Sequence, residues 1–307
     1  MTTALIECVP NFSEGRELAK IDRIVEAIAG VGGILVLDRE SDPDHNRSVL
    51  TFAGPPEAVL EASVRAAGEA ARLIDLNVHR GEHPRIGAMD VLPFVPLRGA
   101  SMEECAALAV QAGERIWRRW RVPIYLYGEA ARQPERRNLA DIRRGGFEAL
   151  REEARRGGNR RPDIGGPELH PTAGAVAAGA RKILVAYNIQ LASDDLAAAK
   201  AIARRIRESS GGLPCVKAMG VRLASRGQVQ VSMNLTDYEV TPPHAAFAAV
   251  EEEARRLGIA VDGSEVIGLA PRRAMAMARA DLRLRGSGRT FMLEDRLEEA
   301  IREAKLE

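Results

Sequence analysis

The chain has 307 residues, of which 46% are hydrophobic and 28% charged, a balance typical of a globular protein with one large domain or two compact ones. Its formal net charge of only +1 argues against a nucleic-acid or membrane-surface partner. Three widely spaced cysteines without a CxxC pair indicate reduced thiols and no disulfide frame. Without a signal-peptide pattern or an apolar stretch of membrane-spanning length, we expect a cytoplasmic protein.

The first half of the chain predicts strands alternating with helices. The apolar run ALIECV, ended by Pro10, predicts a buried strand, and residues 17–30 carry an apolar stripe with helical spacing. A polar turn is expected at 40–46, between two strands. The remaining predicted elements of this half are strands at 34–38, 47–54, 89–97 and 123–127, and helices from 55 and over 101–120.

The second half repeats this plan, after a connector over 128–165 that predicts one helix near 139–154. Each half has the order β-α-β-β-α-β, which is typical of a ferredoxin-like subdomain. The fold class is therefore predicted as α/β (α+β), with subdomains 1–180 and 181–307 flanking a ligand-binding cleft. The predicted elements are strands at 182–189, 215–223, 227–235 and 262–268, and helices at 193–208 and 243–257.

Polar side chains follow the first strand, in the segment PNFSEG. Ser13 is expected to cap the next helix, with Glu14 favoured by the helix dipole. This leaves Asn11 without a structural role, so it is a candidate ligand-binding residue.

A second polar cluster, DRESDPDHNR, lies between two strands. Turn formation explains Asp42 to Asp44, since Asp-Pro and Asn are common in turns. Arg47 begins the following strand, where its guanidinium is suited to bind a carboxylate in bidentate geometry.

The most informative segment is NVHRGEHPRIGAMD, which contains two of the five histidines of the chain. Histidine titrates near neutral pH and is the commonest general base. A zinc site is the competing interpretation, because His79 and His83 have i, i+4 spacing. Gly81 lies between them and Pro84 follows, so a helix is not expected there and no metal is predicted. A purely structural role suits His79 better than His83.

Two further segments are less specific. Small residues dominate 165–181, and they allow a flat ligand to approach the backbone, although the pattern is neither a Walker A loop nor GxGxxG. Seven arginines against three glutamates lie in 143–161. This surplus is compatible with RNA binding, with a solvated helix face, or with attraction of an anionic ligand tail.

Together these segments resemble the glutamate formimidoyltransferase (formiminotransferase) family. The stretches ECVPNFSEG, HNRSVLTFAG, HRGEHPRIGAMDV, IYLYGEAAR and AGARKILVAYNI occur in the family's order across nearly the whole chain. The resemblance implies two α/β subdomains flanking a tunnel, a homodimer, tetrahydrofolate as co-substrate without a metal, and N-formiminoglutamate as donor. It also implies histidine degradation and one-carbon metabolism. The animal members carry a cyclodeaminase domain, and the expectation here is the stand-alone form.

The resemblance also implies roles for individual residues. His83 matches the catalytic base, and Glu40 the assisting acid, although Asp42 and Asp44 remain alternatives because the animal enzymes carry an aspartate there. Asn11, Asn46 and Arg47 match the glutamate side. The folate side is matched by Thr172, Ala173, Gly174, Ala175, Val176, Ala177, Ala178, Gly179, Ala180 and Arg181.

The chemistry implied is attack of N5 of tetrahydrofolate on the formimino carbon, with His83 taking the proton from N5 and returning it to the departing glutamate nitrogen. A carboxylate and Asn11 would stabilise the tetrahedral intermediate, and Arg47 would hold a substrate carboxylate. His79 and His170 remain rival bases. Folate-dependent formyl transfer to or from glutamate is the alternative enzyme function, and an RNA-binding or scaffold protein the remote one.

Overall fold

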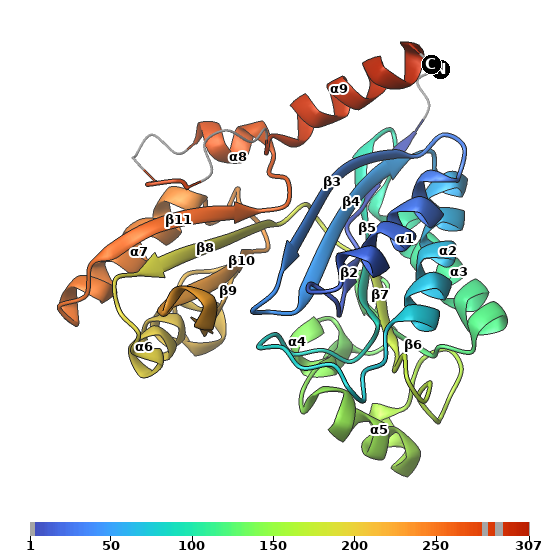
Figure 1. Ribbon diagram of the computed structural model, residues 1–307, viewed down its shortest axis with the longest axis horizontal. Coiled ribbons are helices and arrows are strands. Elements are labelled where there is room, and N and C mark those ends of the chain that lie inside the picture. Colours follow the sequence, from blue (N-terminus) through green and yellow to red (C-terminus); the bar gives the residue numbers. More distant parts are fainter. Residues whose placement is uncertain (1–3, 278–281, 286–290, 307) are drawn as a thin grey trace. The chain divides into compact units, whose positions relative to one another are not determined.

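The computed structural model describes residues 4–277, 282–285 and 291–306 (Figure 1). The chain folds into two compact units that meet in sequence between Arg181 and Lys182. Each unit contains one β-sheet, of seven strands in unit 1 and four in unit 2. The predicted mixed α/β architecture with one sheet in each half is confirmed.

The sheet of unit 1 has the order β3-β4-β1/β2-β5-β7-β6, in which β1 and β2 are two segments that both pair with β4 and β5. Pairing is antiparallel from β3 to β5 and parallel among β5, β7 and β6. The strands are β1 (Leu5–Cys8), β2 (Asn11–Phe12), β3 (Leu35–Asp42), β4 (Arg47–Gly54), β5 (Met89–Arg98), β6 (Ile124–Gly128) and β7 (Val176–Ala180).

Three helices, α1 (Leu18–Ala29), α2 (Pro56–Leu73) and α3 (Met102–Trp120), lie side by side on one face of this sheet (Figure 1). The apolar face of each helix packs in the core. In α1 the buried residues of this face are Ile21, Ile24 and Ile28. A capping box starts α3, with the N–H of Glu104 donating to Ser101 Oγ at 3.2 Å. Strands β7 and β6 extend the antiparallel part of the sheet beyond β5.

The sheet of unit 2 has the order β11-β8-β10-β9 and is antiparallel throughout. Along β10, Val229, Val231 and Met233 are buried on the side of the core, as their alternation with polar residues predicts. The elements of unit 2 are β8 (Val185–Leu191), α6 (Leu196–Ile206), β9 (Val216–Leu223), β10 (Gln228–Leu235), α7 (Pro243–Arg256), β11 (Val261–Ile267), α8 (Arg272–Ala276) and α9 (Leu293–Leu306).

The predicted N-terminal cap of the first helix is wrong. Helix α1 begins at Leu18, and the hydroxyl of Ser13 donates to the carbonyl of Gly87 at 2.7 Å instead of capping a helix. The carboxylate of Glu14 accepts the N–H groups of three residues, Gly15, Arg16 and Glu17, at 2.9–3.0 Å. Burial alone would raise the pKa of Glu14, but these backbone bonds and Lys20 hold it below its usual value.

Two other local predictions need correction. Strand β3 continues through Asp42, so the turn expected at 40–46 is shorter. The single helix expected near 139–154 is two helices, α4 (Leu139–Ile142) and α5 (Gly146–Arg156). Gly145 and Gly146 separate them with φ angles of 79° and 69°, which a continuing helix does not allow. Short 3₁₀ segments occur at Pro134–Arg136, Gly158–Arg160, Glu208–Ser210 and Ala224–Arg226.

The small-residue stretch before Arg181 contains a strand that the sequence did not predict. Ala173 to Ala180 are all buried, and β7 lies between β5 and β6 in the middle of the sheet. A Cβ atom on Gly179 would meet the backbone oxygen of Tyr127 at 2.3 Å. The small side chains therefore serve close packing within the sheet, whatever else they contact.

We expect Gly179→Ala to lower the free energy of unfolding by about 1–3 kcal/mol, because the added methyl group overpacks a buried strand. Gly32→Ala is the matched control, since a Cβ atom there has nothing within 4 Å. Urea denaturation of the three proteins would measure the difference as a shift in the unfolding midpoint. Equal midpoints for Gly179→Ala and wild type would contradict the packing role of this glycine.

Candidate active site

Five polar residues from separate segments of unit 1 meet at one place, which we call the His83 cluster. Strand β2 supplies Asn11, the first residue of β4 is Arg47, and the second residue of β5 is Asp90. His83 lies in the loop between α2 and β5, and Arg143 directly follows α4.

Asp90 is the centre of this cluster and is fully buried. Its Oδ1 accepts the backbone N–H of Ile86 at 2.8 Å, and its Oδ2 accepts N–H groups from Arg47 at 3.0 Å and from Arg143. Burial alone would raise the pKa of Asp90, but the charges of Arg143 and Arg47 hold it below its usual value. The residue is therefore an ionised carboxylate shared by two guanidinium groups.

The guanidinium of Arg47 is held on several sides. Its Nε and Nη2 donate to Asn11 Oδ1 at 2.9 and 2.5 Å, and the Asn11 amide nitrogen donates to the carbonyl of Val9 at 2.9 Å. Its Nη1 lies 3.0 Å from both Asp90 Oδ2 and His83 Nδ1. Burial, and then the second guanidinium of the cluster, lower the pKa of Arg47 to about 10, so it remains charged at neutral pH.

His83 contacts two groups through Nδ1: the carbonyl of Pro84 at 2.8 Å and Arg47 Nη1 at 3.0 Å. A carbonyl only accepts and a guanidinium only donates, so one Nδ1 serves one of them at a time. When Nδ1–H donates to Pro84, Nε2 carries the lone pair, and no residue in the described part of the chain hydrogen-bonds to Nε2. Burial, Arg47 and Arg143 hold the pKa of His83 well below its usual value. The ring is thus neutral at neutral pH, with Nε2 available as a base.

The two rival histidines have structural contacts instead. His79 is buried, its Nε2 lies 2.8 Å from the carbonyl of Asn46, and its Nδ1 accepts from Arg85 Nε at 2.9 Å. The Nδ1 atom of His170 accepts the backbone N–H of Ala173 at 3.0 Å. Because both nitrogens of His79 are already bonded within the protein, it is a poorer candidate base than His83.

Asn46 connects three segments around the cluster. It is buried, with a left-handed φ of 47°, its Oδ1 accepts the N–H of Gly15 at 2.9 Å, and its Nδ2 donates to the carbonyl of Arg80 at 2.9 Å. These bonds give Asn46 a role in holding the loops. Its predicted contact with substrate stays a prediction.

Among the three predicted assisting acids, Asp42 contacts His45, whose ring packs against His83. Its carboxylate accepts the backbone N–H of His45 at 2.8 Å and lies 3.4 Å from His45 Nδ1. The ring of His45 packs edge-on to His83, with centroids 6.2 Å apart. Glu40 lies in β3 opposite Val49 in β4. The choice among Glu40, Asp42 and Asp44 stays open.

Sequence reasoning missed two members of the cluster. Asp90 could have been predicted from the sequence, because it is the only charged residue between Ile86 and Leu97. An acid in a buried strand needs a partner. Arg143 could not have been predicted, since it is one of the seven arginines in 143–161 and looks like the rest. Several of the others are paired at the surface, such as Arg144 with Asp141.

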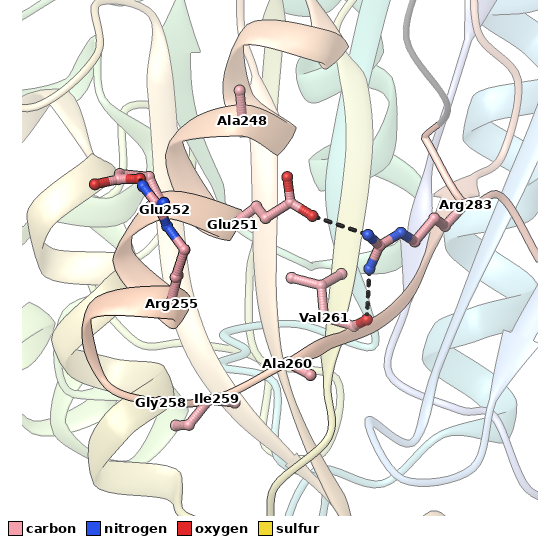
Figure 2. Close-up of a pocket in the computed structure, with 9 residues that line it drawn as sticks. All are labelled: Ala248, Glu251, Glu252, Arg255, Gly258, Ile259, Ala260, Val261 and Arg283. Atoms are coloured by element: carbon pink, nitrogen blue, oxygen red, sulfur yellow. Dashed lines mark hydrogen bonds and ion pairs between the residues drawn. The ribbon is translucent and has the colours of Figure 1, made fainter.

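A surface cavity of about 520 Å³ occurs elsewhere, in unit 2, between the end of α7 and the start of β11 (Figure 2). Arg283 donates to Glu251 at 3.1 Å and to the carbonyl of Val261 at 2.9 Å, and Arg255 pairs with Glu252. Its charged side chains are thus paired with one another, and none of the predicted site residues lines it.

In residues 4–277, 282–285 and 291–306, no three His, Cys, Asp or Glu side chains converge as a metal site would require. No helix in those ranges is long and apolar enough to span a bilayer.

Comparison with known families matches both units. Residues 5–181 match the model of the formiminotransferase domain, N-terminal subdomain, and residues 186–306 match that of the formiminotransferase domain. A glutamate formimidoyltransferase of Thermoplasma acidophilum is 43% identical over 97% of this chain and 98% of its own length. One of Streptococcus pyogenes serotype M1 is 45% identical over 88% of this chain and 90% of its own length. The mouse formimidoyltransferase-cyclodeaminase is 45% identical, and 52% of its length is covered.

Asp90→Asn should lower the free energy of unfolding by about 3–5 kcal/mol at neutral pH, since it leaves two buried guanidinium groups without their counterion. The folded pKa of Asp90 is depressed, so its stabilisation is present above the unfolded pKa and is lost as the pH falls through the folded one. The difference in free energy of unfolding between wild type and Asp90→Asn should therefore become smaller at acidic pH.

Urea denaturation at several pH values measures this difference. Asp141→Asn, which removes an exposed pair with Arg144, is the control and should change stability by less than about 1 kcal/mol. A pH-independent difference would show that Asp90 is not ionised in the folded protein.

Proposed function

The chain belongs to the formiminotransferase family, and we propose that its glutamate formimidoyltransferase activity runs on the His83 cluster. The observation that carries the proposal is a histidine whose Nε2 has no hydrogen-bond partner among the described residues, set beside two nearly buried arginines. This is the arrangement that a general base near anionic substrates requires. The activity belongs to histidine degradation and folate one-carbon metabolism.

The reaction transfers the formimino group from N-formiminoglutamate to N5 of tetrahydrofolate. A bond forms between N5 and the formimino carbon, and the bond from that carbon to the glutamate nitrogen breaks. Nε2 of His83 takes the proton from N5 and returns it to the departing nitrogen, so no proton or electron is gained or lost overall. The products are 5-formiminotetrahydrofolate and glutamate.

The carbonyl of Pro84 assists this proton transfer. While His83 is protonated, its Nδ1–H donates to Pro84, 2.8 Å away, and this bond stabilises the imidazolium that forms. The charges of Arg47 and Arg143 act in the opposite direction, so the imidazolium is short-lived and releases its proton readily.

The net charge of the His83 cluster favours the binding of an anionic substrate. Two guanidinium groups share the one carboxylate of Asp90, which leaves one net positive charge beside His83. N-formiminoglutamate carries two carboxylates, so its binding is favoured there. Within this arrangement Arg47 contributes charge and, with Asn11, fixes the position of the base.

The folate side is supported less directly. Of the predicted residues Thr172 to Arg181, only the two ends are partly accessible, because Ala173 to Ala180 are buried in and beside β7. We therefore keep Thr172 and Arg181 as the folate-side candidates. The ligand tunnel, the homodimer and the independence from metal stay predictions.

The direct test incubates the purified protein with tetrahydrofolate and N-formiminoglutamate in the presence of a chelator. We expect 5-formiminotetrahydrofolate and glutamate to form in equal amounts, with N-formylglutamate a poor donor. Product only from N-formylglutamate would favour the formyl transferase alternative. Activity that disappears on chelation and returns with one metal would contradict the metal-free prediction.

His83→Ala should lower kcat by about 10²–10⁴-fold, the usual contribution of general-base catalysis, while both substrates still bind. In the wild type, the acidic limb of the pH–rate profile should lie below the ordinary histidine range, because the base is neutral above its depressed pKa. That limb should be absent in the variant. Steady-state kinetics across pH measure both effects.

His170→Ala is the control, because the contact of His170 is to its own loop. Near-normal kcat in His83→Ala, together with loss of activity in His170→Ala, would mean that the base has been misassigned.

A further inference from the structure

The two arginines of the His83 cluster differ in how many of their N–H groups are used. All three nitrogens of Arg47 donate to acceptors within the protein: Nε and Nη2 to Asn11, and Nη1 to Asp90. Arg143 donates only from Nη2, to Asp90. Its Nε is buried without an acceptor, and its Nη1 has none among the described residues either.

An unpaired buried donor on a charged group is unusual and calls for an explanation. Two hydrogen bonds fix the backbone position of Arg143: its N–H donates to the carbonyl of Leu139 at 3.1 Å, and its carbonyl accepts the N–H of Gly146 at 2.9 Å. The side chain is 12% exposed and reaches Asp90. The guanidinium thus keeps vacant donors at a fixed, nearly buried position, as a site for an anion does.

The location of Arg143 restricts which carboxylate it can bind. Arg143 and Arg47 donate to the same Oδ2 of Asp90, and Arg47 in turn contacts the ring of His83. In N-formiminoglutamate the α-carboxylate is attached to the carbon that bears the departing nitrogen, so it lies close to the reacting atoms. The carboxylates of folate are separated from N5 by the methylene bridge and the aminobenzoyl group. A carboxylate that binds to Arg143 in the His83 cluster therefore belongs to N-formiminoglutamate and not to folate.

We propose that Arg143 binds the α-carboxylate of N-formiminoglutamate through its vacant Nε and Nη donors, while Arg47 positions His83. This rests on the proposed function and assigns the substrate contact to a residue other than the Arg47 that the sequence suggested. A carboxylate there pairs the orphaned N–H of Arg143 and neutralises the net positive charge of the cluster. Binding the α-carboxylate also fixes the formimino carbon relative to Nε2 of His83.

The test compares Arg143→Gln and Arg143→Lys with Arg47→Lys in steady-state kinetics with both substrates varied. Loss of a charge-assisted bidentate contact should raise the KM for N-formiminoglutamate by roughly 10- to 100-fold in both Arg143 variants. Their KM for tetrahydrofolate should stay within about twofold of wild type. Arg47→Lys should instead lower kcat, because it disturbs the base. Arg144→Gln is the control and should resemble wild type, since Arg144 is exposed and outside the cluster.

A substrate analogue makes the assignment independent of how well the variants fold. N-formimino-4-aminobutyrate lacks only the α-carboxylate, so wild type should use it with a KM raised by a similar factor. Arg143→Gln should show no further rise with this analogue. An unchanged KM for N-formiminoglutamate in Arg143→Gln, an equal rise for tetrahydrofolate, or full use of the analogue by wild type would each overturn the proposal. Failure of the proposed function would look different: wild type itself would form no product from the two natural substrates.

Discussion

The buried carboxylate of Asp90 is the interaction on which the rest of the site depends. A buried charge near the start of a packed strand is tolerated only with partners, and Asp90 has three: the backbone of Ile86 and the guanidinium groups of Arg47 and Arg143. These partners come from β4, from the loop before β5, and from the end of α4. One carboxylate thus brings together segments that are far apart in the sequence, and it does so directly beside His83.

The same carboxylate determines the chemistry. Without it, two like charges would repel each other in a dry environment; with it, one net positive charge remains. Together with burial, that charge lowers the pKa of His83, and it favours an anionic substrate, so in the proposed function one arrangement would serve both catalysis and binding. The loops are held by a second, uncharged set of hydrogen bonds from Asn46 and His79.

Much of the fold could be predicted from periodicity, because the apolar spacings in α1 and β10 follow directly from which face is buried. Strand β7 could not, since alanine and glycine carry no clear period and their role depends on neighbouring strands. Ser13 was misassigned because a cap and a long-range bond look the same in sequence. His83 was proposed as a site residue from its motif, whereas Arg143 depends on a tertiary contact to Asp90 that no local pattern records.

The central claim is that His83 is held neutral, with its proton on Nδ1 and a lone pair on Nε2. The most direct measurement is ¹⁵N NMR of the histidine side chains across pH, with His83→Gln used to assign the signal. We predict a neutral Nδ1–H ring that stays unprotonated well below pH 6.5, the ordinary midpoint for histidine being about 6.5. A ring that titrates at its ordinary midpoint, or one protonated on Nε2 when neutral, would contradict the account.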